Sequence, residues 1–227
     1  MGLDDGRKKG PVIAVDGTAA SGKGTIARAL AEHFGLPHMD TGLLYRAVAL
    51  NLWRWGGNPA SEFEALRACG DLGFDPDDPD LRSEPVSKIA SMISAYPSVR
   101  GALLERQQEF ARQEGGAVLD GRDIGTVIAP EAQVKLFVSA SPEVRAERRL
   151  KELQCRGMNA HYDDVLADIR SRDERDSHRD TAPLKAAPDA VLLDTSALSP
   201  DAAIAKAVHL VSERLGLVGA QRGKPRI

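Results

Sequence analysis

The sequence predicts an α/β fold in which a central five-stranded parallel sheet lies between two layers of helices. Five short apolar runs occur along the 227 residues, and longer segments with apolar residues at helical spacing separate them. This alternation is typical of a parallel sheet with helices on both faces. The runs cover residues 12–15, 36–39, 117–119, 134–138 and 190–193.

Each apolar run ends in polar or small residues, which marks one edge of the expected sheet as the ligand side. In an open parallel sheet, ligands bind beyond the carboxyl ends of the strands. The segments 16–25, 40–46 and 120–126 all follow such ends. We therefore expect these segments to share one cleft despite their separation in sequence.

Residues 17–25 form a glycine-rich loop of the kind that binds phosphate. The loop lies between the first apolar run and a helical pattern that Gly35 can end. Backbone N–H groups of a tightly curled loop attract an anion together with the positive end of the helix, and Lys23 can reach the β- and γ-phosphates of a nucleotide. Because Gly24 follows Lys23, the next hydroxyl is that of Thr25. We therefore expect Thr25 to act on a magnesium ion through water.

The segment 40–46 predicts a further phosphate contact, at the point where a strand passes into a helix. Thr41 can donate to a phosphate oxygen, and Arg46 can pair with the same group through two hydrogen bonds. Alone, this pattern is more typical of a surface arginine on an ordinary helix. Beside a phosphate-binding loop, it favours a binding site.

Asp120, which follows the third apolar run, is the expected acid that faces a magnesium ion. Enzymes with such a loop place a carboxylate there, in contact with the ion directly or through water. Arg122 and Asp123 are too polar for a simple turn, and Gly121 and Gly125 permit close approach of the backbone to a ligand. This segment is therefore predicted to be functional.

Two arginine-rich helical segments, 144–157 and 162–179, are expected to form a lid. In the first segment, Arg145, Arg148 and Arg149 share one face. The second repeats charged residues at helical spacing, namely Arg172, Asp176 and Arg179. Salt-bridged, solvated helices are the alternative. Clustered arginines on a closing segment would stabilise the charge of a transferred phosphoryl group and exclude water.

The remaining elements are expected to be mainly helical. Helices are predicted near residues 43–55, 61–70, 85–95 and 98–113, and the acidic, proline-bearing stretch 75–80 is predicted to be a solvated connection. Ser141-Pro142 and Ser199-Pro200 predict the starts of two more helices.

The composition narrows the classes of partner. A net charge of -3 and an apolar content of 42% argue against general binding to nucleic acid or membrane, and favour small phosphorylated molecules. Cys69 and Cys155 lie far apart without metal-ligand spacing, and no leader or membrane-length apolar run is evident, which favours the cytoplasm. Structural or solvent-facing roles are expected for His33, His38, His161, His178 and His209.

Taken together, these motifs resemble the bacterial cytidylate kinases, a family of nucleoside monophosphate kinases. The resemblance runs from about Val12 to Leu215 and is most specific in 17–25, 40–46, 96–100, 120–126, 172–179 and 182–184. It implies a three-layer P-loop kinase that moves the γ-phosphoryl group of ATP to CMP, and also to dCMP, with Mg²⁺. We expect a monomer with a core (11–42, 115–144, 186–218), an acceptor-binding region (43–114) and a lid (145–185).

The resemblance also implies roles for individual positions. ATP would contact Gly17, Thr18, Ala19, Ala20, Ser21, Gly22, Lys23, Gly24 and Thr25. The acceptor phosphate would contact Thr41, Arg46 and Arg122, and the base would contact Ser91, Arg100 and Asp123. The sugar would contact Arg172 and Asp176, and Arg179 would contact the phosphates. Tyr45 would also lie in the acceptor site. The expected catalytic residues are Lys23, Arg122, Arg148 and Arg149, and the expected metal contacts are Thr25 and Asp120.

Other functions remain open from the residues alone. A UMP or AMP kinase is the near alternative, a shikimate-type kinase a more distant one, and a nucleotide-switched binding protein the alternative from another class. Arginines at both the acceptor cleft and the lid favour a kinase, since a switch needs only a nucleotide and a partner surface. Residues 73–85 occupy the place where many family members carry a longer, strand-rich insert.

Overall fold

The computed structural model describes residues 10–70 and 72–217, and the strands in this part of the chain form one parallel sheet. The strand order is β2-β3-β1-β4-β5. The strands are β1 (Val12–Gly17), β2 (His38–Asp40), β3 (Ala117–Gly121), β4 (Val134–Ser139) and β5 (Val191–Asp194). This confirms the predicted five-stranded parallel sheet. The second strand begins two residues later than predicted, because Pro37 has no N–H to donate and only its carbonyl accepts a bond, from Val118.

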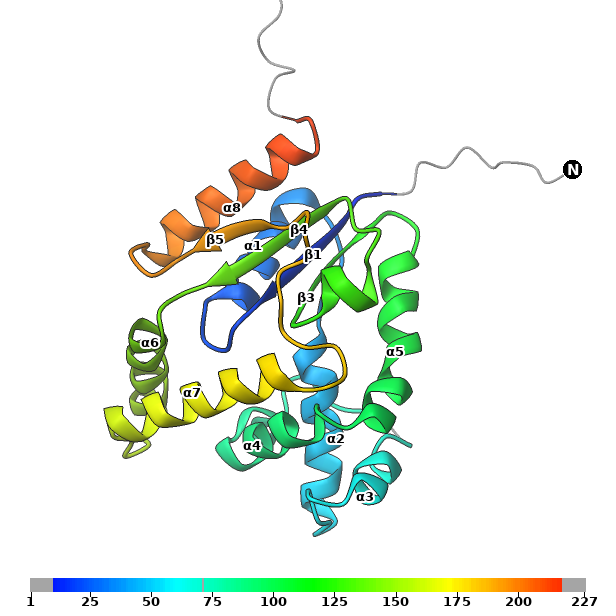
Figure 1. The fold of residues 1–227 in the computed structure, drawn as a ribbon, viewed down its shortest axis with the longest axis vertical. Helices are drawn as coiled ribbons and strands as arrows, with labels where there is room; N and C mark the ends of the chain where they lie inside the picture. Colours follow the sequence, from blue (N-terminus) through cyan, green and yellow to red (C-terminus); the bar gives the residue numbers. More distant parts are fainter. Residues whose placement is uncertain (1–9, 71, 218–227) are drawn as a thin grey trace, which may run out of the picture.

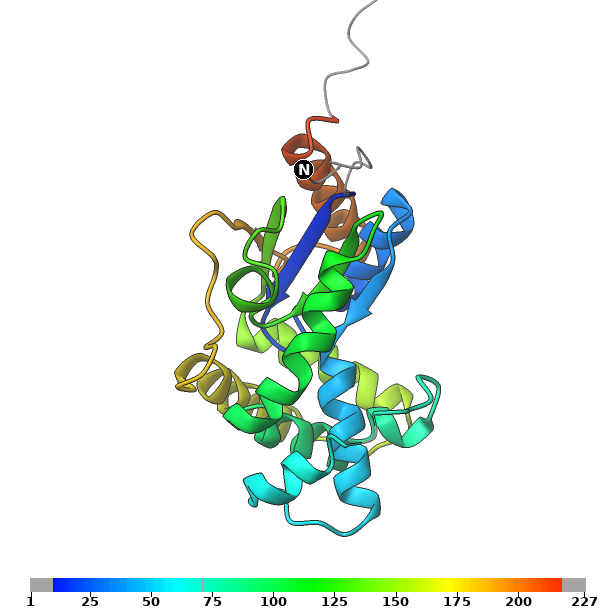
Figure 2. The same cartoon turned by 90° about the vertical axis from the view of Figure 1, so that its right-hand side faces the viewer.

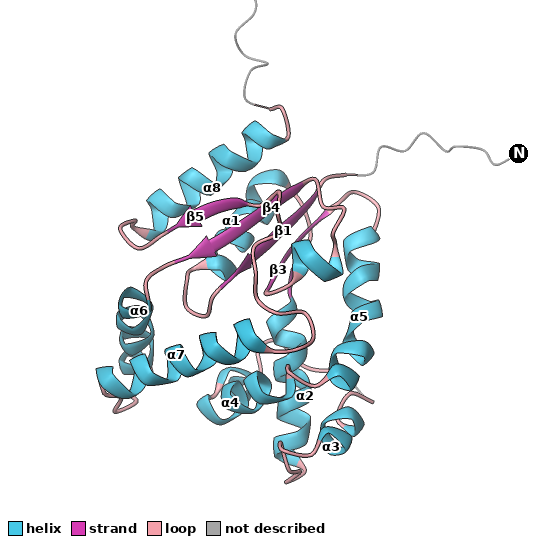
Figure 3. Cartoon of the chain, in the orientation of Figure 1, coloured by secondary structure: helices cyan, strands magenta, loops and turns pink. Residues whose placement is uncertain are grey.

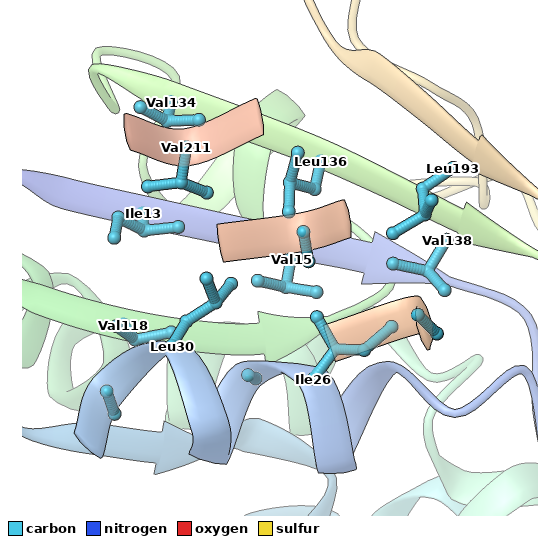
Figure 4. Close-up of a cluster of buried hydrophobic side chains, with 14 residues drawn as sticks. Ile13, Val15, Ile26, Leu30, Val118, Val134, Leu136, Val138, Leu193 and Val211 are labelled. Atoms are coloured by element: carbon cyan, nitrogen blue, oxygen red, sulfur yellow. The ribbon is translucent and has the colours of Figure 1, made fainter. Parts of the chain in front are cut away.

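Helices cover both faces of this sheet and produce the predicted three layers (Figures 1 and 2). On one face lie α1 (Lys23–Phe34) and α8 (Pro200–Arg214), and on the other lie α5 (Pro97–Arg112) and the short π-helix η2 (Ile124–Ile128). Figure 4 shows the first interface, in which Val15 and Leu136 of the sheet pack with Ile26 and Val211 of the helices. Burial of each such side chain stabilises the fold by roughly 1.5–3 kcal/mol.

The half of the molecule beyond the carboxyl ends of the strands is helical (Figure 3). It contains α2 (Thr41–Arg54), α3 (Glu62–Arg67), the 3₁₀-helix η1 (Pro79–Arg82), α4 (Glu84–Ile93), α6 (Pro142–Cys155) and α7 (Tyr162–His178). The α2–α5 region has its own hydrophobic cluster, which includes Leu52, Leu81 and Leu103. A smaller cluster that includes Leu153 and Ile169 joins α6 to α7. These helices therefore stand above the ligand edge of the sheet on separate apolar cores.

The helix starts predicted at the two serine-proline pairs are confirmed. Ser141 accepts from the N–H of Val144, and Ser199 accepts from the N–H of Ala202, so each caps its helix. The predicted helix at 61–70 is shorter, since α3 ends at Arg67. No helix in the described ranges is long and apolar enough to cross a membrane.

Candidate active site

The phosphate-binding loop joins β1 to α1 in a conformation that depends on small residues. A Cβ at Gly17 would lie 2.0 Å from the carbonyl oxygen of Val138, so only glycine fits there. Ala20 and Gly22 adopt left-handed backbone conformations, with φ of 57° and 89°. Left-handed residues within such a loop turn successive N–H groups inward, which suits anion binding. Gly22 is the N-cap of α1, so the positive end of the helix also points at this loop.

Asp120 of β3 contacts the first residue of α1, Lys23, and the first residue of β2, His38. Lys23 Nζ lies 3.9 Å from Asp120 Oδ2, while His38 Nε2 lies 2.8 Å from Asp120 Oδ1. Burial and then the neighbouring charge of Arg122 lower the pKa of Lys23 to about 8, although Asp120 acts in the opposite direction. A phosphate that binds beside Lys23 would therefore raise the pKa of this lysine and favour its charged form.

A cleft beyond the ends of β2 and β3 is lined by many of the predicted acceptor-site residues. These are Thr41, Tyr45, Arg46, Arg100, Arg122, Asp123, Arg172, Asp176 and Arg179. They come from α2, α5, the loop after β3 and the end of α7, which are far apart in sequence. The predicted sharing of one cleft is confirmed for segments 40–46 and 120–126, whereas no residue of 16–25 lines this cleft.

Alternating charges cross this cleft. The carboxylate of Asp123 accepts from Arg100 on one side and from Arg179 Nη2 at 3.5 Å on the other. Arg122 donates its Nε–H to Asp176 Oδ2 at 2.7 Å. All five side chains are mostly buried, so the hydrogen bonds hold them in defined positions.

Among the described residues, Arg172 is the arginine of this cleft whose charge is least balanced by hydrogen-bonded acceptors. Its Nε is buried and, among the described residues, has no hydrogen-bond partner. Burial and then the neighbouring Arg122 lower the pKa of Arg172 to about 10, although Asp176 acts in the opposite direction. A buried donor without an acceptor costs free energy, which an anionic ligand oxygen can recover.

The arginines of α6 contact the phosphate-binding loop in two places. Arg145 Nη1 donates to the carbonyl of Ala19 and Arg145 also pairs with Asp173 of α7, while Arg148 Nη1 donates to the carbonyl of Ser21 at 3.4 Å. Arg148 also binds Thr195, through Oγ1 and the backbone carbonyl. The first half of α6 is therefore attached to the loop in this conformation.

Arg149 joins α6 to another helix, α4. It pairs with Glu84 of α4 at 2.6 Å and with Glu152 at 2.9 Å. It lines a cleft that also includes Ala19, Ala20, Arg46 and Arg172. Arg149 thus links α6 to α4, next to the glycine-rich loop.

Two predicted acceptor contacts have other partners in this structure. Thr41 donates its hydroxyl proton to the carbonyl of Asp120 at 2.8 Å. Ser91 accepts from Arg175 and lines the cleft beside Arg149, whereas Ser94 lines the cleft with Asp123. The sequence assigned Ser91 to the base by resemblance alone. Which cleft a serine faces depends on the direction of its side chain on α4, which the sequence does not show.

Two contacts had no signal in the sequence. His38 was expected to have a structural or solvent-facing role, yet it is hydrogen-bonded to Asp120. Asp16 was seen only as the polar end of a strand, yet it binds the backbone of the loop after β3. Both partners lie on segments more than 80 residues away, so no local pattern could reveal them.

The fold and this site together define a P-loop phosphotransferase, with one anion loop at the end of β1 and an arginine-lined acceptor cleft beside it. The family model of cytidylate kinase matches residues 13–213. The chain belongs to the cytidylate kinase family, whose members are nucleoside monophosphate kinases.

Individual relatives are similar over nearly their whole length. A cytidylate kinase of Xanthobacter autotrophicus is 58% identical over 205 residues, which cover 89% of this chain and 98% of the relative. One of Paramagnetospirillum magneticum is 54% identical over 217 residues, covering 93% and 99%. A solved structure of an uncharacterised protein from Eubacterium ventriosum aligns with a TM-score of 0.53 at 13% identity, covering 89% of this chain and 98% of that one; this likeness concerns the fold alone.

Proposed function

We propose that this chain transfers the γ-phosphoryl group of ATP to CMP and to dCMP, giving ADP and CDP or dCDP. The observation that carries the proposal is the Arg100–Asp123 pair, which is buried in an arginine-lined cleft next to the phosphate-binding loop. Family membership supports the same activity.

Cytosine suits the charges of this pair. Its amino group donates and its N3 and O2 accept, so Asp123 can accept from the amino group while Arg100 donates to the ring. Uracil presents an acceptor and an N3–H donor at the corresponding positions, which would leave buried partners unpaired. Such a mismatch is more discriminating than an apolar pocket, because unpaired buried polar groups are costly.

The acceptor phosphate would lie among Arg46, Arg122 and Arg172, although the resemblance alone assigns Arg172 to the sugar. The uncompensated Nε of Arg172 supports this placement, since an anion would supply the acceptor that it lacks. Phosphoryl transfer depends mainly on positioning and charge, and a phosphate acceptor is already anionic. No side chain is therefore required to remove a proton from it.

On the donor side, residues 17–25 would hold the phosphates of ATP, with Lys23 on the transferred group. The inward-turning loop and the helix N-terminus support this role. In the transition state, the positive charge of Lys23 would stabilise the negative charge on the moving phosphoryl group. Arg148 and Arg149 are proposed to add charge from the lid side and to exclude water.

Asp120 and Thr25 fit a magnesium ion that is held mainly by phosphates and water. No group of three or more potential ligands gathers in the described part of the chain, and Asp120 is a single buried carboxylate that faces Lys23 and Gly24. One or two carboxylates plus phosphate oxygens are the usual surroundings of Mg²⁺ at such sites. The ion would neutralise phosphate charge, while Asp120 and the exposed Thr25 would orient its water ligands.

We also propose that the protein is a monomer in the cytoplasm. Free thiols at Cys69 and Cys155 agree with a reducing compartment. Size-exclusion chromatography with light scattering tests the assembly, and a dimer mass would contradict it.

The activity is tested by measuring ADP release with Mg²⁺ and ATP against CMP, dCMP, UMP, AMP and shikimate. We expect rapid turnover of CMP and dCMP and little of the other three. Equal use of UMP or AMP would contradict the cytidylate assignment, and ATP binding without turnover of any acceptor would contradict kinase activity.

A further inference from the structure

Asp16 connects the phosphate-binding loop to the segment that follows β3. It lies at the end of β1, immediately before the phosphate-binding loop, and is 4% exposed. Its Oδ1 accepts the backbone N–H of Ile124 at 2.7 Å, and its Oδ2 accepts that of Gly125 at 2.8 Å. Both oxygens of the carboxylate thus accept hydrogen bonds from a segment more than a hundred residues away.

The two N–H groups belong to the first turn of η2. Such groups have no partner within their own helix and need an acceptor from elsewhere. The N-cap residue, Asp123, makes no capping hydrogen bond with its side chain. Its carboxylate instead faces the cleft, where it binds Arg100 and Arg179. Asp16 therefore performs the capping that Asp123 would otherwise perform.

We propose that Asp16 is a positioning residue for acceptor recognition, because its capping of η2 leaves Asp123 free to face the base. This inference rests on the proposed function. It also gives the short π-helix a role, since such turns occur mostly at functional sites. The same carboxylate ties the segment of Arg122 and Asp123 to the start of the ATP-binding loop at Gly17.

The space around this contact leaves little freedom. A Cβ at Gly125 would lie 3.0 Å from Lys135 Cδ and 3.4 Å from Asp16 Oδ2. At the other end, Gly17 is fixed by the carbonyl of Val138. Burial raises the pKa of Asp16 to about 6, against the two backbone hydrogen bonds that favour its charged form. A buried carboxylate costs stability, which the two backbone N–H groups of Ile124 and Gly125 offset here.

The variant Asp16→Asn tests the proposal. The amide keeps the size and one acceptor oxygen, but its NH₂ group opposes one backbone N–H. We expect the Kd and KM for CMP to rise at least about tenfold and the CMP/UMP preference to fall at least about fivefold, while the Kd for ATP changes by less than about threefold. Calorimetric titration with CMP and with ATP measures binding independently of turnover.

Ile13→Ala is the matched control, since Ile13 lies in the same strand, is fully buried and packs against α1 and α8, on the face of the sheet opposite η2. We expect it to lower Tm without changing the CMP/UMP preference. An unchanged preference in Asp16→Asn, or equal losses of CMP and ATP affinity, would overturn the inference. If the wild-type protein itself does not bind CMP, the proposed function fails instead.

Gly125→Ala carries the test if Asp16→Asn does not fold. The added methyl group would crowd Lys135 Cδ at 3.0 Å and would contact Asp16 Oδ2 at 3.4 Å, and the backbone at Gly125 accepts an alanine because its φ is not in the left-handed region. We expect a smaller loss of CMP affinity, about threefold, with the same fall in CMP/UMP preference. An unchanged Kd for CMP would contradict the proposal.

Discussion

Arg122 of the loop after β3 donates its Nε–H to Asp176 of α7 across 2.7 Å, so this loop and α7 are joined directly. Burial alone would raise the pKa of Asp176, but Arg122 and Arg172 hold it below its usual value. The pair therefore stabilises the conformation in which α7 covers the cleft.

We expect Asp176→Asn to lower the free energy of unfolding by about 1–3 kcal/mol at neutral pH, because Arg122 loses its charged partner. Since the folded pKa of Asp176 is depressed, this contribution is complete above about pH 4, the unfolded value, and is lost as the pH falls through the folded pKa. Urea unfolding of both proteins across this range measures the difference. A difference that grows on acidification would contradict the assignment.

Lys23→Ala should reduce phosphoryl transfer at least about a hundredfold, because it removes a charge that stabilises the transition state. Lys206→Ala is the control, since Lys206 is exposed on α8, away from the clefts described above. Circular dichroism checks that both variants fold. Retention of more than about a tenth of the wild-type turnover in Lys23→Ala would contradict the role of the loop.

Binding of ATP should be linked to proton uptake above pH 8. The pKa of Lys23 is about 8 in the free protein, and a neighbouring phosphate favours the charged form. At about pH 9 the free lysine is mostly neutral and binding takes up most of a proton, whereas at about pH 6.5 it is already charged. Calorimetry in buffers of different ionisation enthalpy measures the uptake. Lys23→Arg should abolish it, since arginine stays charged, and uptake that persists there would assign the proton to another group.

Substitution of the lid arginines should lower turnover more than it weakens CMP binding. Arg148→Ala removes a contact between α6 and the phosphate-binding loop, and Arg149→Ala removes a contact with α4. We expect kcat to fall at least about tenfold in each, with a KM for CMP within about threefold of wild type. Arg170→Ala is the control, because Arg170 is 61% exposed and pairs only with Glu143. Equal effects in all three variants would favour plain solvated helices.

Base choice should depend on the Arg100–Asp123 pair. We expect the wild-type protein to prefer CMP over UMP at least roughly a hundredfold in kcat/KM, and Arg100→Met or Asp123→Ala to reduce CMP use far more than residual UMP use. Competition between the two nucleotides in one ADP-release assay measures the ratio. If both variants keep the wild-type ratio, another group reads the base.

Much of the fold could be predicted because its signals are local. The apolar runs, the glycine spacing of residues 17–25 and the serine-proline starts of α6 and α8 each act within a few residues. The π-helix η2 could not be predicted, since its first turn is stabilised by Asp16, which no nearby pattern indicates. Among the arginines, spacing grouped Arg145 with Arg148 and Arg149, but it did not show that Arg145 is buried against Asp173 and the phosphate-binding loop.

The sequence by itself determined the class of sheet, the phosphate-binding loop and the set of charged residues that gather at one edge, because periodicity and motif spacing are properties of neighbouring residues. Only the tertiary structure decided which charges become partners. The order β2-β3-β1-β4-β5 places β1 beside β3, and this brings Asp16 under η2 and Lys23 near Asp120. The docking of α7 then pairs Asp176 with Arg122 and leaves the Nε of Arg172 without a partner among the described residues. These contacts join residues that are many positions apart, so their energies exist only once the sheet and its helices have assembled.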